Sequence, residues 1–76
     1  MLTAEETATL NRLTAEMKTL LDKAHSLSEA DVTKVGDVLG DMESYFGGVP
    51  TLRPDIPDNV QKMFLALWHV FQAQEF

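Results

Sequence analysis

The sequence predicts an all-α fold, a small three-helix bundle that consists of an antiparallel helical hairpin, a proline-containing strap and a third helix. Three observations predict it. Apolar residues recur at steps of three and four along three separate stretches. Residues that cap helices precede each stretch. The chain has 76 residues, which is the length of one domain. We therefore expect a single helical domain over residues 1–76.

The first helix is predicted over residues 3–25. Thr3 and Glu6 have the spacing of a capping box, in which the hydroxyl and the carboxylate each accept a backbone N–H. Glu5 and Glu6 also lie at the positive end of the helix dipole. The apolar stripe that follows predicts a buried face, and it comprises Leu10, Leu13, Met17, Leu20, Ala24 and Leu27.

The second helix is predicted over residues 29–46. Ser28 and Asp31 form a variant of the same capping box, and Gly47 offers the left-handed residue that ends many helices. A turn of only two or three residues around Ser26–Ser28 makes the first two helices antiparallel neighbours. The second apolar stripe comprises Val32, Val35, Leu39, Met42 and Phe46.

Residues 47–57 are predicted to form a strap across the bundle, because three prolines prevent a helix there. Its apolar members alternate with polar residues or prolines, so we expect them to fix the strap to the helices. These anchoring residues are Val49, Leu52 and Ile56.

The third helix is predicted over residues 58–74. Two starts fit the sequence: Asp58 forms a box-like start with Gln61, or Asp55 caps the helix and Pro57 lies in its first turn. The two alternatives stay open. The core stripe of this helix comprises Val60, Met63, Phe64, Leu67, Val70 and Phe71.

Composition excludes several classes of partner. Twelve acidic residues against six basic ones give a formal charge of −6, which disfavours direct binding to nucleic acid or to an anionic membrane. There is no cysteine, no apolar run of about 20 residues and no basic leader at the N-terminus. The sequence therefore predicts a cytoplasmic protein without disulfides or membrane contact. A core this small also favours a homodimer.

No motif for catalysis, for a cofactor or for a metal is apparent, and we expect the protein not to be an enzyme. His25 and His69 lie far apart in the sequence, and neither is placed beside a serine and a carboxylate. Gly47 and Gly48 follow a helix without the lysine of a phosphate-binding loop, so they are interpreted as a turn.

The apolar arc of the third helix is wide, either because this helix faces two neighbours in the bundle or because the monomer leaves Trp68 and Leu65 exposed. Trp68 lies at its margin and Leu65 lies beyond it, close to Gln61 and Gln72. One interpretation makes these four residues a contact surface for another protein or for a second copy of the chain. The other interpretation makes Trp68 an ordinary core residue that is covered by the strap.

The second helix carries two further unexplained features. Gly36 and Gly40 lie on one strip of this helix. Either another backbone packs closely against that strip, or glycine is merely tolerated there. Asp37 and Asp41 lie on its solvated side, within an acidic stretch that either only faces water or recognises a basic protein surface. This stretch comprises Glu29, Asp31, Asp37, Asp41 and Glu43, with Lys34 as the opposing charge.

These features predict a small acidic protein–protein interaction module, a regulator or inhibitor that binds a larger protein through an apolar helix face. The predicted partner-binding residues are Trp68, Leu65, Gln61, Gln72, Gly36, Gly40, Asp37 and Asp41. One alternative is an acidic nucleic-acid mimic, for example a phage-encoded antagonist that blocks a DNA- or RNA-binding protein. Another is a structural subunit without a regulatory role.

Overall fold

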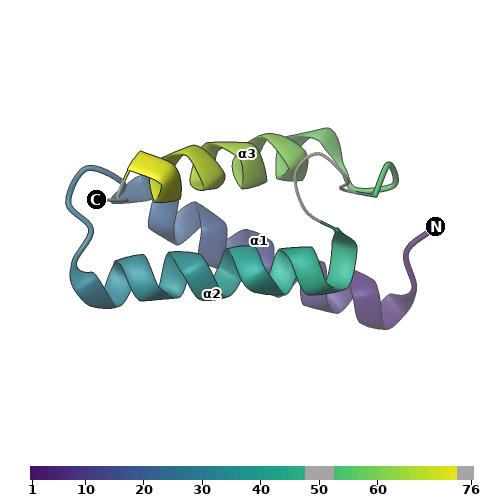
Figure 1. Cartoon of the computed structure of the whole chain (residues 1–76). Coiled ribbons are helices and arrows are strands. Elements are labelled where there is room, and N and C mark those ends of the chain that lie inside the picture. The colour runs from purple at the N-terminus through teal and green to yellow at the C-terminus, as the bar shows by residue number, and fades with distance from the viewer. Residues whose placement is uncertain (48–52, 74–76) are drawn as a thin grey trace.

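The computed structural model describes residues 1–47 and 53–73, and within them it confirms the three-helix bundle. Its helices are α1 (Ala4–Asp22), α2 (Glu29–Phe46) and α3 (Asp58–Ala73). Helices α1 and α2 form an antiparallel hairpin, and α3 runs back antiparallel to α2 (Figure 1). Each helix packs against the other two.

Both predicted capping boxes form. The Glu6 backbone N–H donates to Thr3 Oγ1 over 3.0 Å, and the Thr3 N–H donates to Glu6 Oε1 over 2.9 Å. Ser28 and Asp31 make the equivalent pair of hydrogen bonds at the start of α2, at 3.2 and 3.1 Å. The two boxes are local patterns, and each fixes the first residue of its helix.

The predicted end of the first helix at residue 25 is wrong. Helix α1 ends at Asp22, and Lys23 and Ala24 donate to the carbonyls three residues earlier, as in a tightened last turn. The connection to α2 is therefore six residues, 23–28, and not two or three. His25 consequently lies in the turn and not at the end of a helix.

Gly47 ends α2 as predicted, with a positive φ of 89° that favours glycine. Its ψ of 161° is extended, so the conformation is not the left-handed helical one that was expected. The strap is held to α2 by a hydrogen bond from the Arg53 N–H to the Phe46 carbonyl. Ile56 is buried, which confirms it as an anchor; Val49 and Leu52 lie outside the described residues.

Helix α3 begins at Asp58, but neither of the two predicted caps forms. The Gln61 backbone N–H donates to the Pro57 carbonyl, which places Pro57 in the capping position. The Gln61 side chain donates to the Ile56 carbonyl over 2.7 Å. Asp55 is engaged by Arg53 instead of by the helix. The helix is described to Ala73, and residue 74 lies outside the described part of the chain.

The core is formed by the apolar stripes of the three helices together with Ile56. No polar or charged residue is buried within the described ranges. None of the described helices combines the length and the apolar character needed to cross a membrane. The buried residues are Leu10, Leu13, Met17, Leu20, Val35, Val38, Leu39, Met42, Phe46, Ile56, Val60, Phe64 and Leu67.

Candidate functional site

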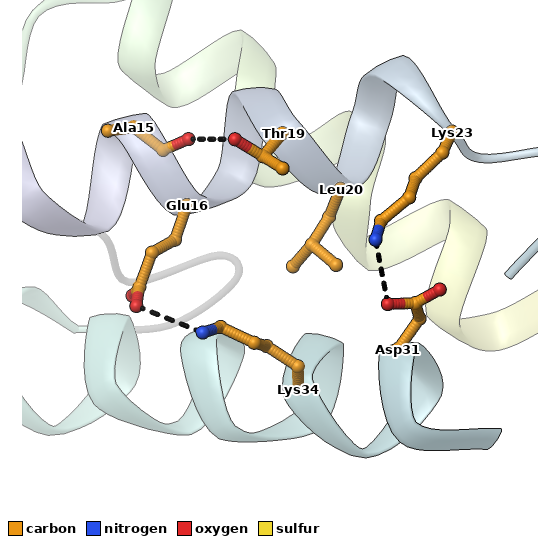
Figure 2. A pocket seen from close by; sticks show the side chains of 7 residues that line it. All are labelled: Ala15, Glu16, Thr19, Leu20, Lys23, Asp31 and Lys34. Carbon is orange, nitrogen blue, oxygen red and sulfur yellow. Dashed lines mark hydrogen bonds and ion pairs between the residues drawn. The ribbon is translucent and has the colours of Figure 1, made fainter. Parts of the chain in front are cut away.

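The seam between α1 and α2 is closed by paired charges. Lys23 Nζ lies 2.9 Å from Asp31 Oδ1, and Lys34 Nζ lies 3.5 Å from Glu16 Oε1 (Figure 2). The hydrogen bond from Lys23, followed by that from the Ser28 backbone, holds the pKa of Asp31 below its ordinary value. Both ion pairs border a shallow groove of about 290 Å³ over Leu20. Two charges of α2, those of Asp31 and Lys34, therefore have an opposite charge on the side of α1.

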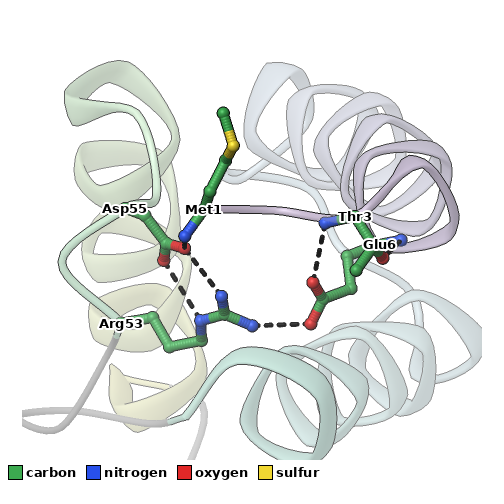
Figure 3. Close-up of polar contacts among 5 residues, drawn as sticks. All are labelled: Met1, Thr3, Glu6, Arg53 and Asp55. Carbon is green, nitrogen blue, oxygen red and sulfur yellow. Dashed lines mark hydrogen bonds and ion pairs between the residues drawn. The ribbon is translucent and has the colours of Figure 1, made fainter.

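A second polar cluster joins the strap to α1. Arg53 donates to both carboxylate oxygens of Asp55 and, over 2.6 Å, to Glu6 (Figure 3). The Met1 amino group lies 3.2 Å from Asp55. Hydrogen bonds from Thr3 and then from Arg53 lower the pKa of Glu6, and Arg53 lowers that of Asp55. These contacts link residues 47 positions apart and position the strap beside the first turn of α1.

The seam between α2 and α3 is apolar. A methyl group added at Gly36 would lie 3.5 Å from the ring of Phe71, an ordinary van der Waals contact. Glycine at this position therefore lies under a side chain of α3. No hydrogen bond or ion pair connects α2 with α3 among the residues that the structure describes. Among the described residues, these two helices contact each other through apolar packing.

The order of side chains around α3 shows which side Trp68 and Leu65 occupy. Met63 borders a groove shared with α1, and Phe71 contacts α2 at Gly36. At about 100° per residue, Phe71, Trp68 and Leu65 follow one another in steps of about 60°, in the direction away from Met63. Trp68 and Leu65 therefore lie on the outer, α2-facing side of α3.

The side chains of α3 become more exposed to solvent from Trp68 to Leu65. Trp68 is half-buried and packs against the core, whereas Leu65 is 41% exposed. Gln72 is exposed, and Gln61 is half-buried with its side-chain amide donating to the Ile56 carbonyl. We name these four residues, Gln61, Leu65, Trp68 and Gln72, the α3 edge. The structure thus brings all four predicted residues of α3 to one side of that helix.

The two glycines of α2 have different environments. Gly36 is half-buried under Phe71, so its described neighbour is a side chain of α3 and not another backbone. Gly40 is exposed, and a Cβ there would have no neighbour within 4 Å. The described contacts of the fold do not require glycine at Gly40.

The solvent side of α2 carries negative charge only. Lys34, the one basic residue of α2, is directed to Glu16 on α1. Asp37 is exposed and Asp41 is half-buried, and neither forms an ion pair with a described residue. Four carboxylates of α2 share this lack of an ion pair with a described residue, and we call them the acidic face. They are Glu29, Asp37, Asp41 and Glu43.

The remaining candidates for chemistry are dispersed. His25 lies exposed in the turn after α1, and His69 lies exposed on α3. Within residues 1–47 and 53–73, no group of three or more His, Cys, Asp or Glu side chains could hold a metal ion. Two grooves on the described surface lie between helices, one between α1 and α2 and one between α1 and α3.

Sequence reasoning missed the residues that fix the bundle at its seams. Glu16, Lys34 and Arg53 have no motif around them, and their pairing depends on how the helices are placed against one another. Tyr45 was also missed as a surface residue, although it is 55% exposed. Its place beside the core stripe of α2 gave no signal of that exposure.

Comparisons with models of protein families, with curated proteins and with solved structures give no match to this chain.

Proposed function

We propose that the protein is a small protein-interaction module that docks on a larger protein through the α3 edge and acts as its regulator or inhibitor. The observation that carries the proposal is the 41% exposure of Leu65 beside the half-buried Trp68. Contiguous apolar side chains on the surface of a small domain mark binding sites, and tryptophan is enriched among the residues that dominate binding energy.

The residue types around Leu65 support the same proposal. Gln72 and Gln61 border it on one side with amide groups, which can form hydrogen bonds without the desolvation cost of a charge. The exposed Lys62 and His69 border Leu65 on its other side. An apolar centre with a polar border is typical of a protein–protein interface. Because Trp68 is already packed on one side, little of its conformational freedom is lost on binding.

The experiment uses three immobilised baits: the wild-type chain, Leu65→Glu and Ala66→Glu. Ala66 is exposed on the same helix about 100° away from Leu65, so it controls for the added carboxylate. Proteins captured from the native cell are quantified by mass spectrometry. We expect a partner that the wild type and Ala66→Glu retain and that Leu65→Glu loses. Equal capture by all three baits would contradict docking through the α3 edge.

The acidic face favours a second candidate function, a mimic of nucleic-acid charge that blocks a DNA- or RNA-binding protein. Its supporting observation is that the lysine of α2 is already paired with Glu16. Capture by charge mimicry would fall steeply from low to physiological salt and would not respond to Leu65→Glu. Capture through the α3 edge would be lost in Leu65→Glu and retained in Ala66→Glu. Self-association as a homodimer is a further proposal, which sedimentation equilibrium of the wild type tests.

A further inference from the structure

We infer that the α3 edge binds a basic amphipathic helix of the partner protein, whose apolar side covers Leu65 and Trp68 and whose lysines or arginines face the acidic face of α2. This inference rests on the proposed function and adds the chemical class of the partner. Two observations support the inference: the charge of the acidic face, and the position of that face and the α3 edge on either side of the seam between α2 and α3.

The α3 edge and part of the acidic face border the same seam. Gly36 marks the line of contact between α2 and α3. At about 100° per residue, Glu43 and Glu29 both lie within about 20° of Gly36 around α2. Gly40 lies about 40° further toward solvent, and Asp37 lies beyond it. A segment lying along the outside of the seam would therefore meet carboxylates on α2 and apolar side chains on α3.

The two surfaces also occupy the same part of the bundle along its length. Helices α2 and α3 are antiparallel, and Gly36 lies beside Phe71 (Figure 1). One turn further along α2, Gly40 is at about the height of Trp68, and Glu43 is at about the height of Leu65. The exposed leucine therefore lies across the seam from a carboxylate.

Most basic side chains of the chain are paired with carboxylates away from the α3 edge. Four of the six lie in ion pairs within the chain, and these four are Arg12, Lys23, Lys34 and Arg53. The other two are Lys18, which borders the groove between α1 and α3, and Lys62 on α3. Lys62 lies about 60° beyond Leu65 around α3 and is the one basic side chain of the described α2 and α3 without an ion pair, and a single lysine cannot balance the four carboxylates of the acidic face.

A second copy of this chain is a poor source of that charge. Each copy has a formal charge of −6, and a two-fold dimer places the same surface on both sides of its interface. Even a dimer that packed α2 of one copy on α3 of the other would offer Lys62 alone against four carboxylates. Electrostatic complementarity thus favours a basic partner over a second copy.

The shape of the seam favours a helix. A groove between two antiparallel helices accepts another helix along its length, as in a four-helix bundle. The empty space above Gly40 allows the backbone of the incoming helix to approach closely. Apolar residues spaced three and four apart on that helix could then reach Leu65 and Trp68 together.

Four synthetic peptides of the length of α3 test the inference by titration calorimetry. Three share one leucine face and carry lysine, glutamine or glutamate on the other face; the fourth is a scrambled form of the lysine peptide. Each peptide is titrated into the wild type and four variants. The first two are Leu65→Gln and its control Ala66→Gln. The other two are double variants, Asp37→Asn/Glu43→Gln and its control Glu5→Gln/Asp22→Asn, which remove the same number of charges. All the control positions are exposed.

We expect the lysine peptide to bind the wild type more than tenfold tighter than the scrambled or glutamate peptide at low salt. Leu65→Gln should weaken binding about tenfold, and Asp37→Asn/Glu43→Gln about three- to tenfold. The controls should change binding less than twofold. The lysine, glutamine and glutamate peptides could instead bind with equal affinity and all respond to Leu65→Gln. That result would overturn the inference that the partner is basic, and it would leave the proposed docking face intact.

Two further results would also overturn the inference. Binding of the lysine peptide that is insensitive to Leu65→Gln would show that the α3 edge is not the site, against both the inference and the proposed function. Sedimentation equilibrium that shows a wild-type dimer, dissociated by Leu65→Gln and not by Ala66→Gln, would identify a second copy as the occupant.

Discussion

The two seams that α2 forms with its neighbours are built differently. Toward α1, Lys34 pairs with Glu16 and Asp31 pairs with Lys23 (Figure 2). Toward α3, the described contact is that of Gly36 with Phe71, and Leu65 lies exposed beyond it. The first seam contains ion pairs within the chain. The second leaves apolar surface and carboxylates facing outward, and for that reason we propose that a partner binds there.

The difference also separates residues that stabilise the fold from residues that are available for contact. The buried side chains lie between the three helices, whereas Leu65 and Gly40 lie outside them. Changes at the outer side of the second seam should therefore affect binding more than folding. The following predictions test this separation, in order of decreasing effect on stability.

The largest effect is expected inside the bundle. Leu39 is 4% exposed, and Leu39→Ala should reduce the free energy of unfolding by about 2–5 kcal/mol. Leu65→Ala removes the same atoms from a position that is 41% exposed and should cost about 1 kcal/mol or less. Urea denaturation measures both variants. Similar losses for the two would remove the distinction between core and edge.

Acid should weaken the bundle through its paired carboxylates. The folded-state pKa values of Glu6, Asp31 and Asp55 are lowered, so each ionised group stabilises the fold above its ordinary pKa of 4.5 or 3.8. That stabilisation is lost as the pH falls below these values through the lowered ones. Thermal melts between pH 7 and pH 2 should show a constant melting temperature down to about pH 5 and then a decline.

Glu6→Gln is the test of this assignment. The variant should melt lower than the wild type at pH 7, because the neutral amide oxygen of glutamine accepts a weaker hydrogen bond from Arg53 than the carboxylate of Glu6 does. Its decline in acid should be smaller, since one of the responsible groups is gone. An unchanged decline would mean that Glu6 does not contribute to the acid sensitivity.

Replacing the exposed glycine should stabilise the protein. A Cβ at Gly40 meets no neighbour, so Gly40→Ala should raise the free energy of unfolding by about 0.5–1 kcal/mol through helix propensity. Gly47→Ala is the opposite case, because a positive φ of 89° strains an alanine and should destabilise the fold. A loss of stability in Gly40→Ala would show that the space above Gly40 is filled.

The smallest effect is expected at the closed seam. Lys34 and Glu16 are 56% and 27% exposed, and such partly exposed pairs contribute about 0.2–1 kcal/mol. A double-mutant cycle with Lys34→Gln and Glu16→Gln measures this coupling. It should decrease when salt is raised to about 1 M, where charges are screened within about 3 Å. A coupling that did not respond to salt would not be an ion pair.

The sequence was sufficient for features that depend on neighbours within one helical turn. The capping boxes at Thr3 and Ser28 were predicted because all their partners lie three residues away. The end of α1 was placed three residues too late. The sequence has neither glycine nor proline at that position, and Ala24 and Leu27 continue the apolar spacing into the turn.

Features that depend on how helices pack could not be predicted in the same way. The margin of the arc on α3 indicated that Leu65 would be exposed, but the side of the bundle that it faces follows from the contact of Phe71 with Gly36. That contact joins residues 35 positions apart. The bond between Arg53 and Glu6 likewise depends on the path of the strap.

The most direct test of the open seam compares two variants that differ by one position, Leu65→Glu and Ala66→Glu. Their free energies of unfolding are measured by urea denaturation at a concentration where the chain is monomeric. If the α3 edge is surface, the two values should agree within about 1 kcal/mol, because both carboxylates reach water. A loss of more than about 2 kcal/mol confined to Leu65→Glu would mean that a carboxylate has been buried in the core, and it would contradict the open seam.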